Sequence, residues 1–200
     1  MLYYMPQTWT SDDTDAVERL KIQYGTSIVY PVSSIGAHVS AVPNHQVQRM
    51  TSLQMRGDVA MSGNFGYELD LTRFTEEEKR IVKRQVNDYK AIRGLVQQGD
   101  LYRLLSPFEG NEAAWMFVSA DHTEAIVYYF RILAVPNAPE KRLKLAGLSA
   151  DFDYCIESED SEHSIIWPGD RLMHMGLIIP DLQGDYASAS FKLRALQSLK

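Results

Sequence analysis

The stretch "MPQTWTSDDTDAVERLKIQYG", residues 5–25, places three aspartates within four positions, between a tryptophan and an apolar periodic run. Asp12, Asp13 and Asp15 stand where a strand-like segment gives way to a helix-like one. Acidic side chains suit the first turn of a helix, because the helix dipole is positive there. The same place also follows the carboxyl end of a strand, where α/β barrels keep their catalytic groups. Helix capping and acid chemistry are therefore the two interpretations of this cluster.

Strand-like and helix-like segments alternate through residues 1–98. Short apolar runs are followed by longer runs whose apolar side chains recur at helical spacing. Gly25 marks the expected end of the first helix, and Thr75 and Glu78 make a capping box before the longest one. Such alternation predicts parallel β-α units, but three units are too few for a complete eight-unit barrel. The expected strands are 2–5, 36–42 and 65–71, and the expected helices are 15–25, 49–61 and 75–99.

The hydrophobic period changes to two after Gly99. Short alternating runs are separated by loops rich in Gly, Pro, Asn and Asp, which is typical of an antiparallel sandwich of about seven strands. The sequence therefore predicts an α/β part followed by an all-β part, with a boundary near residue 99. The expected strands are 100–106, 113–120, 124–133, 141–148, 151–158, 171–180 and 186–196.

The bulk composition excludes several classes of protein. The chain of 200 residues is 45% hydrophobic and 23% charged, as soluble globular proteins are, and its net charge of −6 disfavours nucleic acid and anionic membranes as partners. The single cysteine, Cys155, excludes an internal disulfide framework. We find no apolar run long enough for a membrane span and no secretion signal, so we expect a cytoplasmic protein. The apolar run that opens the chain leads us to expect a longer polypeptide around it.

Chemistry favours Asp12 over its two neighbours as a reactive acid. Glycoside hydrolysis needs two carboxyl groups across the scissile bond, one of them protonated. Mutual repulsion of the aspartates favours protonation, whereas the helix N-terminus stabilises the charged forms of Asp13 and Asp15. Asp12 lies furthest from the helix, and Trp9 offers a flat apolar face for a sugar ring. Helix capping remains the competing role.

The histidines do not indicate a metal site. The sequence contains no His-x-x-x-His or Cys-x-x-Cys spacing, so we expect no metal ligands. His38 and His45 flank the end of the expected second strand. They either line a site there or are ordinary histidines that are partly buried and hydrogen-bonded.

Three long blocks resemble the α-galactosidases (melibiases) of glycoside hydrolase family 36. These blocks are "LYYMPQTWTSDDTDAVERLKIQYGTSIVYP" (2–31), "GAHVSAVPNHQ" (36–46) and "RGDVAMSGNFGYELDL" (56–71). The likeness covers essentially the whole chain. It implies the last three units of a (β/α)8 barrel in residues 1–98 and an antiparallel β-sandwich domain in 99–200. It also implies retaining hydrolysis of terminal α-galactosyl residues from oligosaccharides such as melibiose and raffinose, with no cofactor.

The resemblance assigns a role to two residues and reveals an omission. Asp12 matches the family's general acid and base, and Trp9 matches a tryptophan that walls the galactose pocket. The family's nucleophile motif, Lys-x-Asp on an earlier barrel strand, does not occur in the 200 residues. We therefore expect the chain to be inactive by itself and to act within a full-length enzyme that forms homo-oligomers.

Two other functions remain open at this point. One is a non-catalytic module that binds carbohydrate or mediates oligomerisation. The other is a related glycosidase that acts on a different terminal sugar, because family likeness fixes specificity only loosely.

Overall fold

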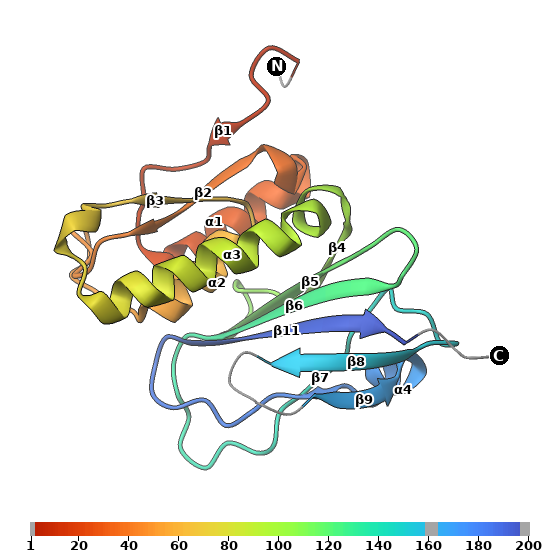
Figure 1. Cartoon of the computed structure of the whole chain (residues 1–200). Helices are drawn as coiled ribbons and strands as arrows, with labels where there is room; N and C mark the ends of the chain where they lie inside the picture. Colours follow the sequence, from red (N-terminus) through yellow and green to blue (C-terminus); the bar gives the residue numbers. More distant parts are fainter. Residues whose placement is uncertain (1–2, 159–163, 197–200) are drawn as a thin grey trace. The chain divides into compact units, whose positions relative to one another are not determined.

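The computed structural model describes residues 3–158 and 164–196. The chain divides into two compact units, Met1–Gln97 and Gln98–Lys200. The first unit mixes strands and helices, and the second consists mainly of strands (Figure 1). Among the described residues, no helix has the length and apolar character needed to cross a membrane.

The first unit is built on a parallel sheet of three strands in the order β1-β2-β3. A helix follows each strand along the chain, so the expected parallel β-α units are confirmed. The strands are β1 (Thr8–Trp9), β2 (Ile35–Ser40) and β3 (Asn64–Glu68), and the helices are α1 (Ala16–Val29), α2 (Leu53–Met61) and α3 (Glu76–Gln98). Short 3-10 turns lie at Val32–Ser34 and Leu71–Arg73.

The two faces of β2 have different surroundings. Ala37 and Val39 point to one face, where they pack with Leu53 and Ala60 in an apolar cluster between the sheet and α2. Alternation along the strand sends every second residue of β2, beginning with Gly36, to the opposite face. That second face carries Gly36, His38 and Ser40, all of them buried. Polar groups therefore gather on the face of the sheet that the helix does not cover.

Two expectations for the first unit were wrong. Residues 3 and 4 form a turn instead of a strand, and Tyr3 and Tyr4 are 88% and 85% exposed, while Leu2 lies outside the described residues. The strand begins later, at Thr8, because the pairing with β2 starts there. Helix α1 also continues past Gly25, since a glycine inside a helix costs only about 1 kcal/mol. The last residue of α1 is Val29. Tyr30, which follows, is extended, because residues that precede a proline prefer an extended backbone.

The second unit is an antiparallel sheet of six strands packed against a smaller layer. The sheet order is β4-β5-β6-β11-β8-β9, and β7 pairs with β10 in a separate ribbon. One apolar core includes Met116 and Phe191 of the sheet, Leu143 and Leu177 of the ribbon, and Leu172 of a short helix. The strands are β4 (Asp100–Leu105), β5 (Glu112–Val118), β6 (Glu124–Arg131), β7 (Arg142–Leu143), β8 (Asp153–Ser158), β9 (Ile165–Pro168), β10 (Leu177–Ile178) and β11 (Ala187–Ala195).

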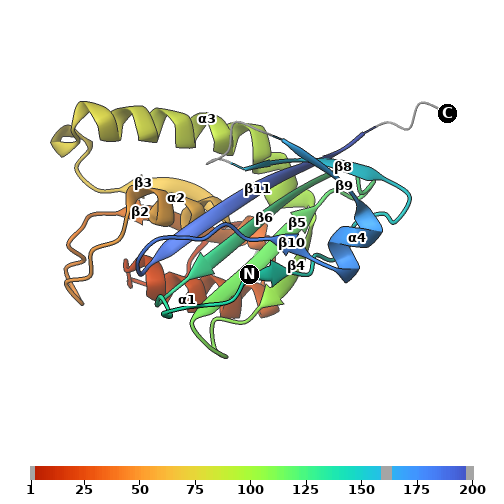
Figure 2. The same cartoon turned by 90° about the horizontal axis from the view of Figure 1, so that it is seen from below.

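The expected strand 171–180 begins as a helix and forms a strand only at β10, Leu177–Ile178. Residues 171–174 belong to α4 (Gly169–His174), which lies beside β9 (Figure 2). Pro168 at the N-cap and Asp170 in the first turn start this helix, and Gly176 follows it with φ of 87°. These are ordinary helix start and stop signals, which the alternating apolar pattern of the segment concealed.

The close contact between α2 and α3 gives a stability prediction. A Cβ atom added at Gly57 would lie 2.1 Å from Nε2 of Gln85. The Gln85 side chain cannot move freely, because it accepts a hydrogen bond from the Tyr67 hydroxyl at 2.8 Å and donates one to the Leu53 carbonyl at 2.9 Å. We expect Gly57→Ala to lower the free energy of unfolding by about 1–3 kcal/mol, despite alanine's higher helix propensity.

Gly94→Ala is the matched control in α3. A Cβ atom at this position would meet nothing within 4 Å, so the substitution should raise the free energy of unfolding by up to about 1 kcal/mol. Urea denaturation of both variants measures the difference. Equal effects of the two substitutions would show that Gln85 does not restrict α2.

Candidate active site

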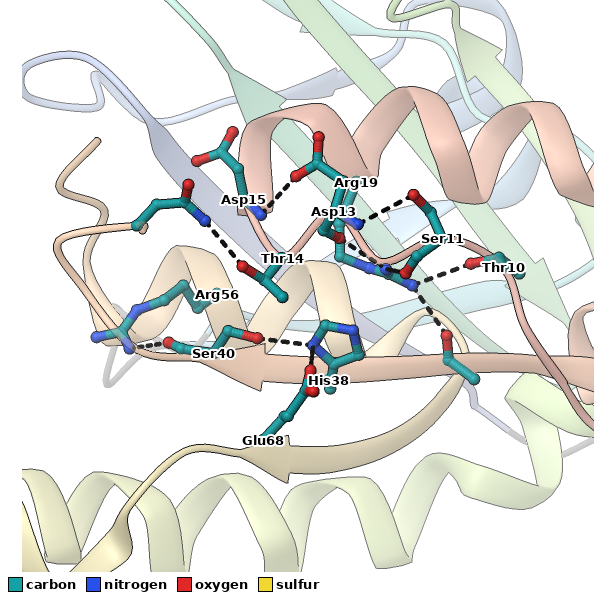
Figure 3. A network of polar contacts seen from close by, with 12 residues as sticks. Thr10, Ser11, Asp13, Thr14, Asp15, Arg19, His38, Ser40, Arg56 and Glu68 are labelled. Atoms are coloured by element: carbon teal, nitrogen blue, oxygen red, sulfur yellow. Dashed lines mark hydrogen bonds and ion pairs between the residues drawn. The ribbon is translucent and has the colours of Figure 1, made fainter. Parts of the chain in front are cut away.

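The carboxyl ends of β1, β2 and β3 lie at one edge of the parallel sheet, and the loops that follow them form the candidate site. Trp9 is the last residue of β1, and Asp12 lies in the loop between β1 and α1. His38 and Ser40 lie near the end of β2, and Glu68 is the last residue of β3. Figure 3 shows the polar contacts that hold most of these segments together.

Arg19 is the centre of this network. Its guanidinium group donates to the carbonyl oxygens of Ser11 at 3.3 Å and Asp13 at 3.0 Å, and to the Thr10 hydroxyl at 3.1 Å. It also donates to the carbonyl of Gly36 in β2 at 2.9 Å (Figure 3). The side chain is buried, and this burial lowers its pKa from the ordinary value, although Asp13 partly offsets the shift. One buried cation therefore fastens the loop that carries Asp12 to strand β2.

Asp13 and Asp15 are occupied by structural contacts. The Asp15 carboxylate accepts a hydrogen bond from the Glu18 amide at 3.1 Å, which makes it the N-cap of α1, and it also pairs with Arg49. The Asp13 carboxylate accepts from the Asp15 amide at 2.9 Å. Both aspartates thus satisfy backbone groups at the start of the helix, as capping residues do.

Asp12 differs from both neighbours. Its side chain is exposed, and no hydrogen bond or ion pair reaches its carboxylate from residues 3–158 or 164–196. The loop backbone on both sides of it is held by Arg19, through the carbonyls of Ser11 and Asp13. Within the described part of the chain, Asp12 is therefore an unpartnered carboxylate on a loop whose backbone is restrained.

Trp9 lies on a surface made by β2. Its indole ring stacks on the His38 imidazole with centroids 4.5 Å apart and planes 12° apart. Trp9 pairs with Gly36 in the sheet, and a Cβ atom at position 36 would lie 3.3 Å from the indole Cε3 atom. The indole remains half exposed. The indole of Trp9 is thus supported by His38 on one side and still accessible to solvent.

His38 is a buried, hydrogen-bonded histidine. Its Nδ1 atom lies 2.7 Å from the Ser40 hydroxyl oxygen and 3.3 Å from the Glu68 carboxylate (Figure 3). Burial lowers the pKa of His38 to about 4, and the positive charge of Arg19 contributes to the shift. The ring is consequently neutral at ordinary pH. His45, by contrast, is exposed, and its ring nitrogen Nδ1 lies 3.4 Å from the Thr14 hydroxyl oxygen.

The loop after β2 is tied to the loop after β1. The side-chain amide of Asn44 donates to the Thr14 hydroxyl at 2.9 Å, and the side-chain oxygen of Gln46 accepts from the Thr14 backbone amide at 3.3 Å. Arg56 of α2, also buried, donates to the Ser40 carbonyl at 2.7 Å. The end of β2 is thereby restrained both by the contacts between the two loops and by α2.

Sequence reasoning missed the two buried arginines and Glu68. One signal for Arg19 was present, because Asp15, Arg19 and Gln23 follow at spacings of four and share one helical face. All three are buried, at 2%, 1% and 3% exposure, so this polar stripe faces the inside. Metal ligation has no support in the described ranges, since they hold no group of three His, Cys, Asp or Glu side chains suited to an ion.

Comparison with known proteins now identifies the family. Residues 1–99 match the family model described as Melibiase, and residues 112–193 match the model for the glycosyl hydrolase family 36 C-terminal domain. The chain belongs to glycoside hydrolase family 36. The parallel β-α units are therefore the barrel-end region of this family, and the antiparallel sheet is its C-terminal domain.

Curated and solved family members cover nearly the whole chain. Alpha-galactosidase AgaA from Geobacillus stearothermophilus is 62% identical over 98% of this chain, and Alpha-galactosidase 1 from Pediococcus pentosaceus is 46% identical over 98%. The crystal structure of an AgaA variant in complex with raffinose superposes with a TM-score of 0.93 at 61% identity, over 98% of this chain and 27% of that one. A further AgaA variant was solved in complex with stachyose. The chain spans 26% of the length of both curated relatives.

The Arg19 network predicts a large effect of a small change. Arg19→Lys keeps the charge but cannot reach four acceptors, since an ammonium group lacks the planar fork of guanidinium. We expect the free energy of unfolding to fall by about 2–4 kcal/mol, because buried carbonyls lose their donors. Lys21→Ala in the same helix is the control and should change it by less than about 0.5 kcal/mol, since Lys21 is exposed. Similar urea midpoints for the two variants would contradict the role of Arg19.

Proposed function

We propose that this chain forms part of a retaining α-galactosidase, in which Asp12 is the general acid and base and Trp9 walls the galactose pocket. The observation that carries the proposal is the division of roles among the three aspartates. Asp15 caps α1 and Asp13 accepts from the Asp15 amide, whereas Asp12 is exposed in the loop after β1 and has no partner in the described part of the chain. The α-galactosidases among its relatives support the substrate class.

Asp12 would act twice in each turnover. In the first step its carboxyl proton passes to the glycosidic oxygen while a carboxylate nucleophile bonds to the anomeric carbon and the leaving sugar departs. In the second step the Asp12 carboxylate removes a proton from water, the water oxygen bonds to the anomeric carbon, and the nucleophile is released. The two carboxyl groups of retaining enzymes stand about 5 Å apart. Because the sequence contains no Lys-x-Asp motif, we propose that the nucleophile comes from another part of a longer polypeptide.

The proposal extends to the two domains and to the whole enzyme. Residues 1–98 would supply the last three units of the catalytic (β/α)8 barrel, and residues 99–200 a β-sandwich domain. The full-length enzyme would be a cytoplasmic homo-oligomer that cleaves terminal α-galactosyl residues from raffinose-type oligosaccharides. The 200-residue chain alone would release no galactose, because one member of a catalytic pair contributes little without the other.

The Asp12→Asn variant of the full-length protein tests the catalytic role. We expect kcat/KM for raffinose to fall about 10²–10⁴-fold, because its leaving sugar needs a proton. A nitrophenyl α-galactoside has a leaving group that departs without protonation, so its cleavage should fall much less. Azide should restore turnover and give α-galactosyl azide, because azide attacks the galactosyl-enzyme intermediate without base assistance. Steady-state kinetics and product analysis measure these effects.

Asp13→Asn is the matched control, because asparagine keeps the oxygen that accepts the Asp15 amide proton. Its kcat/KM should stay within about threefold of wild type. Undiminished raffinose hydrolysis by Asp12→Asn would refute the assignment. A full-length protein that binds raffinose but releases no galactose would instead favour a non-catalytic carbohydrate-binding module.

A further inference from the structure

We propose that His38 is a positioning residue, which holds the indole plane of Trp9 and thereby sets the affinity for the galactosyl ring. This inference rests on the proposed role of Trp9 in the galactose pocket. His38 lies one strand away from Trp9, in β2, and touches it through its ring face. It does not need to contact the substrate to act in this way.

The first argument is the geometry of the two rings. A centroid distance of 4.5 Å with planes only 12° apart brings the indole and the imidazole into face-to-face contact. A tryptophan on a two-residue strand has little backbone pairing to fix its side chain, since β1 spans only Thr8 and Trp9. The stack on His38 therefore supplies the restraint that the short strand does not.

The second argument is the empty position beneath the indole. Gly36 lies opposite Trp9 in the sheet, and a Cβ atom there would come within 3.2 Å of the Thr8 carbonyl oxygen and 3.3 Å of the indole. A side chain there would crowd the indole and the Thr8 carbonyl, which would have to give way by a few tenths of an ångström. The absence of a side chain at position 36 lets the indole lie flat against the strand and reach His38.

The third argument is that His38 is itself held in place. The ring is 5% exposed, and its Nδ1 atom faces both the Ser40 hydroxyl at 2.7 Å and the Glu68 carboxylate at 3.3 Å. A carboxylate only accepts hydrogen bonds, so a proton on Nδ1 satisfies the contact with Glu68. The Nε2 atom is buried without a hydrogen-bond partner among the described residues. The orientation of the ring thus depends on Nδ1 and on the stack with Trp9.

The charge state of His38 supports the same role. With a pKa of about 4, the imidazole stays neutral wherever a neutral-pH enzyme works. A neutral ring can be buried against the indole without the desolvation cost of a cation. His38 is therefore suited to passive support and not to proton transfer at neutral pH.

A double-mutant cycle in the full-length enzyme tests the inference. His38→Ala should raise KM for a nitrophenyl α-galactoside and the inhibition constant of galactose about 3- to 10-fold, with kcat within about twofold of wild type. His38→Phe keeps a flat ring and should recover most of the affinity. In a Trp9→Ala background, His38→Ala should change neither constant further, because its effect passes through the indole. His174→Ala, an exposed histidine of the second unit, is the control and should have no effect.

A second readout does not need catalysis. The difference between the fluorescence of the wild type and of Trp9→Phe reports the indole of Trp9, and its anisotropy should fall in His38→Ala and recover in His38→Phe. If His38→Ala does not fold, His38→Gln takes its place, since glutamine keeps a polar group but no ring.

Three results would overturn the inference. These are an unchanged KM in a folded variant without the ring, an equal loss of affinity in the Trp9→Ala background, and an unchanged anisotropy. Failure of the proposed function is a separate outcome, in which Asp12→Asn hydrolyses raffinose normally while the coupling between His38 and Trp9 persists.

Discussion

A buried arginine holds the candidate site together. Arg19 donates to two carbonyls and a hydroxyl of the loop between β1 and α1, and to the Gly36 carbonyl of β2. Without Arg19 the buried Gly36 carbonyl would lose its donor, which costs about 1–3 kcal/mol, and the three partly buried acceptors of the loop would lose a restraint. These contacts favour one backbone conformation of the loop, and that conformation sets the position of Asp12. The helix that provides Arg19 begins at the same loop, so the local fold and the site are a single unit.

The acidic cluster shows how neighbouring carboxylates acquire different roles. Asp13 and Asp15 accept hydrogen bonds from backbone amides at the start of α1, and Asp15 also pairs with Arg49. Their carboxylates are thereby occupied by hydrogen bonds at the start of the helix. Asp12 is exposed, and its carboxylate accepts no hydrogen bond from the described residues. The same separation extends to the aromatic part of the site, where the Trp9 ring stays half exposed while the His38 ring beneath it is buried. The exposed groups are the ones proposed for catalysis and sugar recognition, and the buried groups restrain them.

The sequence predicted those parts of the fold that local chemistry determines. The capping box of Thr75 and Glu78 is confirmed by reciprocal hydrogen bonds of 2.8 and 3.2 Å. The prediction of a buried strand at residues 2–5 was wrong for the described residues, because an apolar run is buried only where other residues pack over it. The predicted end of α1 at Gly25 was also wrong. The helix continues to Val29 and ends where Pro31 favours an extended backbone at Tyr30. Arg19 was overlooked because three of its acceptors are backbone carbonyls, which any residue type provides. The electrostatic argument and the motif resemblance both favoured Asp12, whereas periodicity did not distinguish among the three aspartates.

The most direct test of the account is a crystal structure of the full-length Asp12→Asn variant with raffinose bound. We expect the amide at position 12 to lie 2.6–3.2 Å from the glycosidic oxygen, which is hydrogen-bond reach. The loop backbone should keep its contacts with Arg19. A galactosyl ring that lies elsewhere, or a different carboxylate at hydrogen-bond distance from that oxygen, would contradict the account.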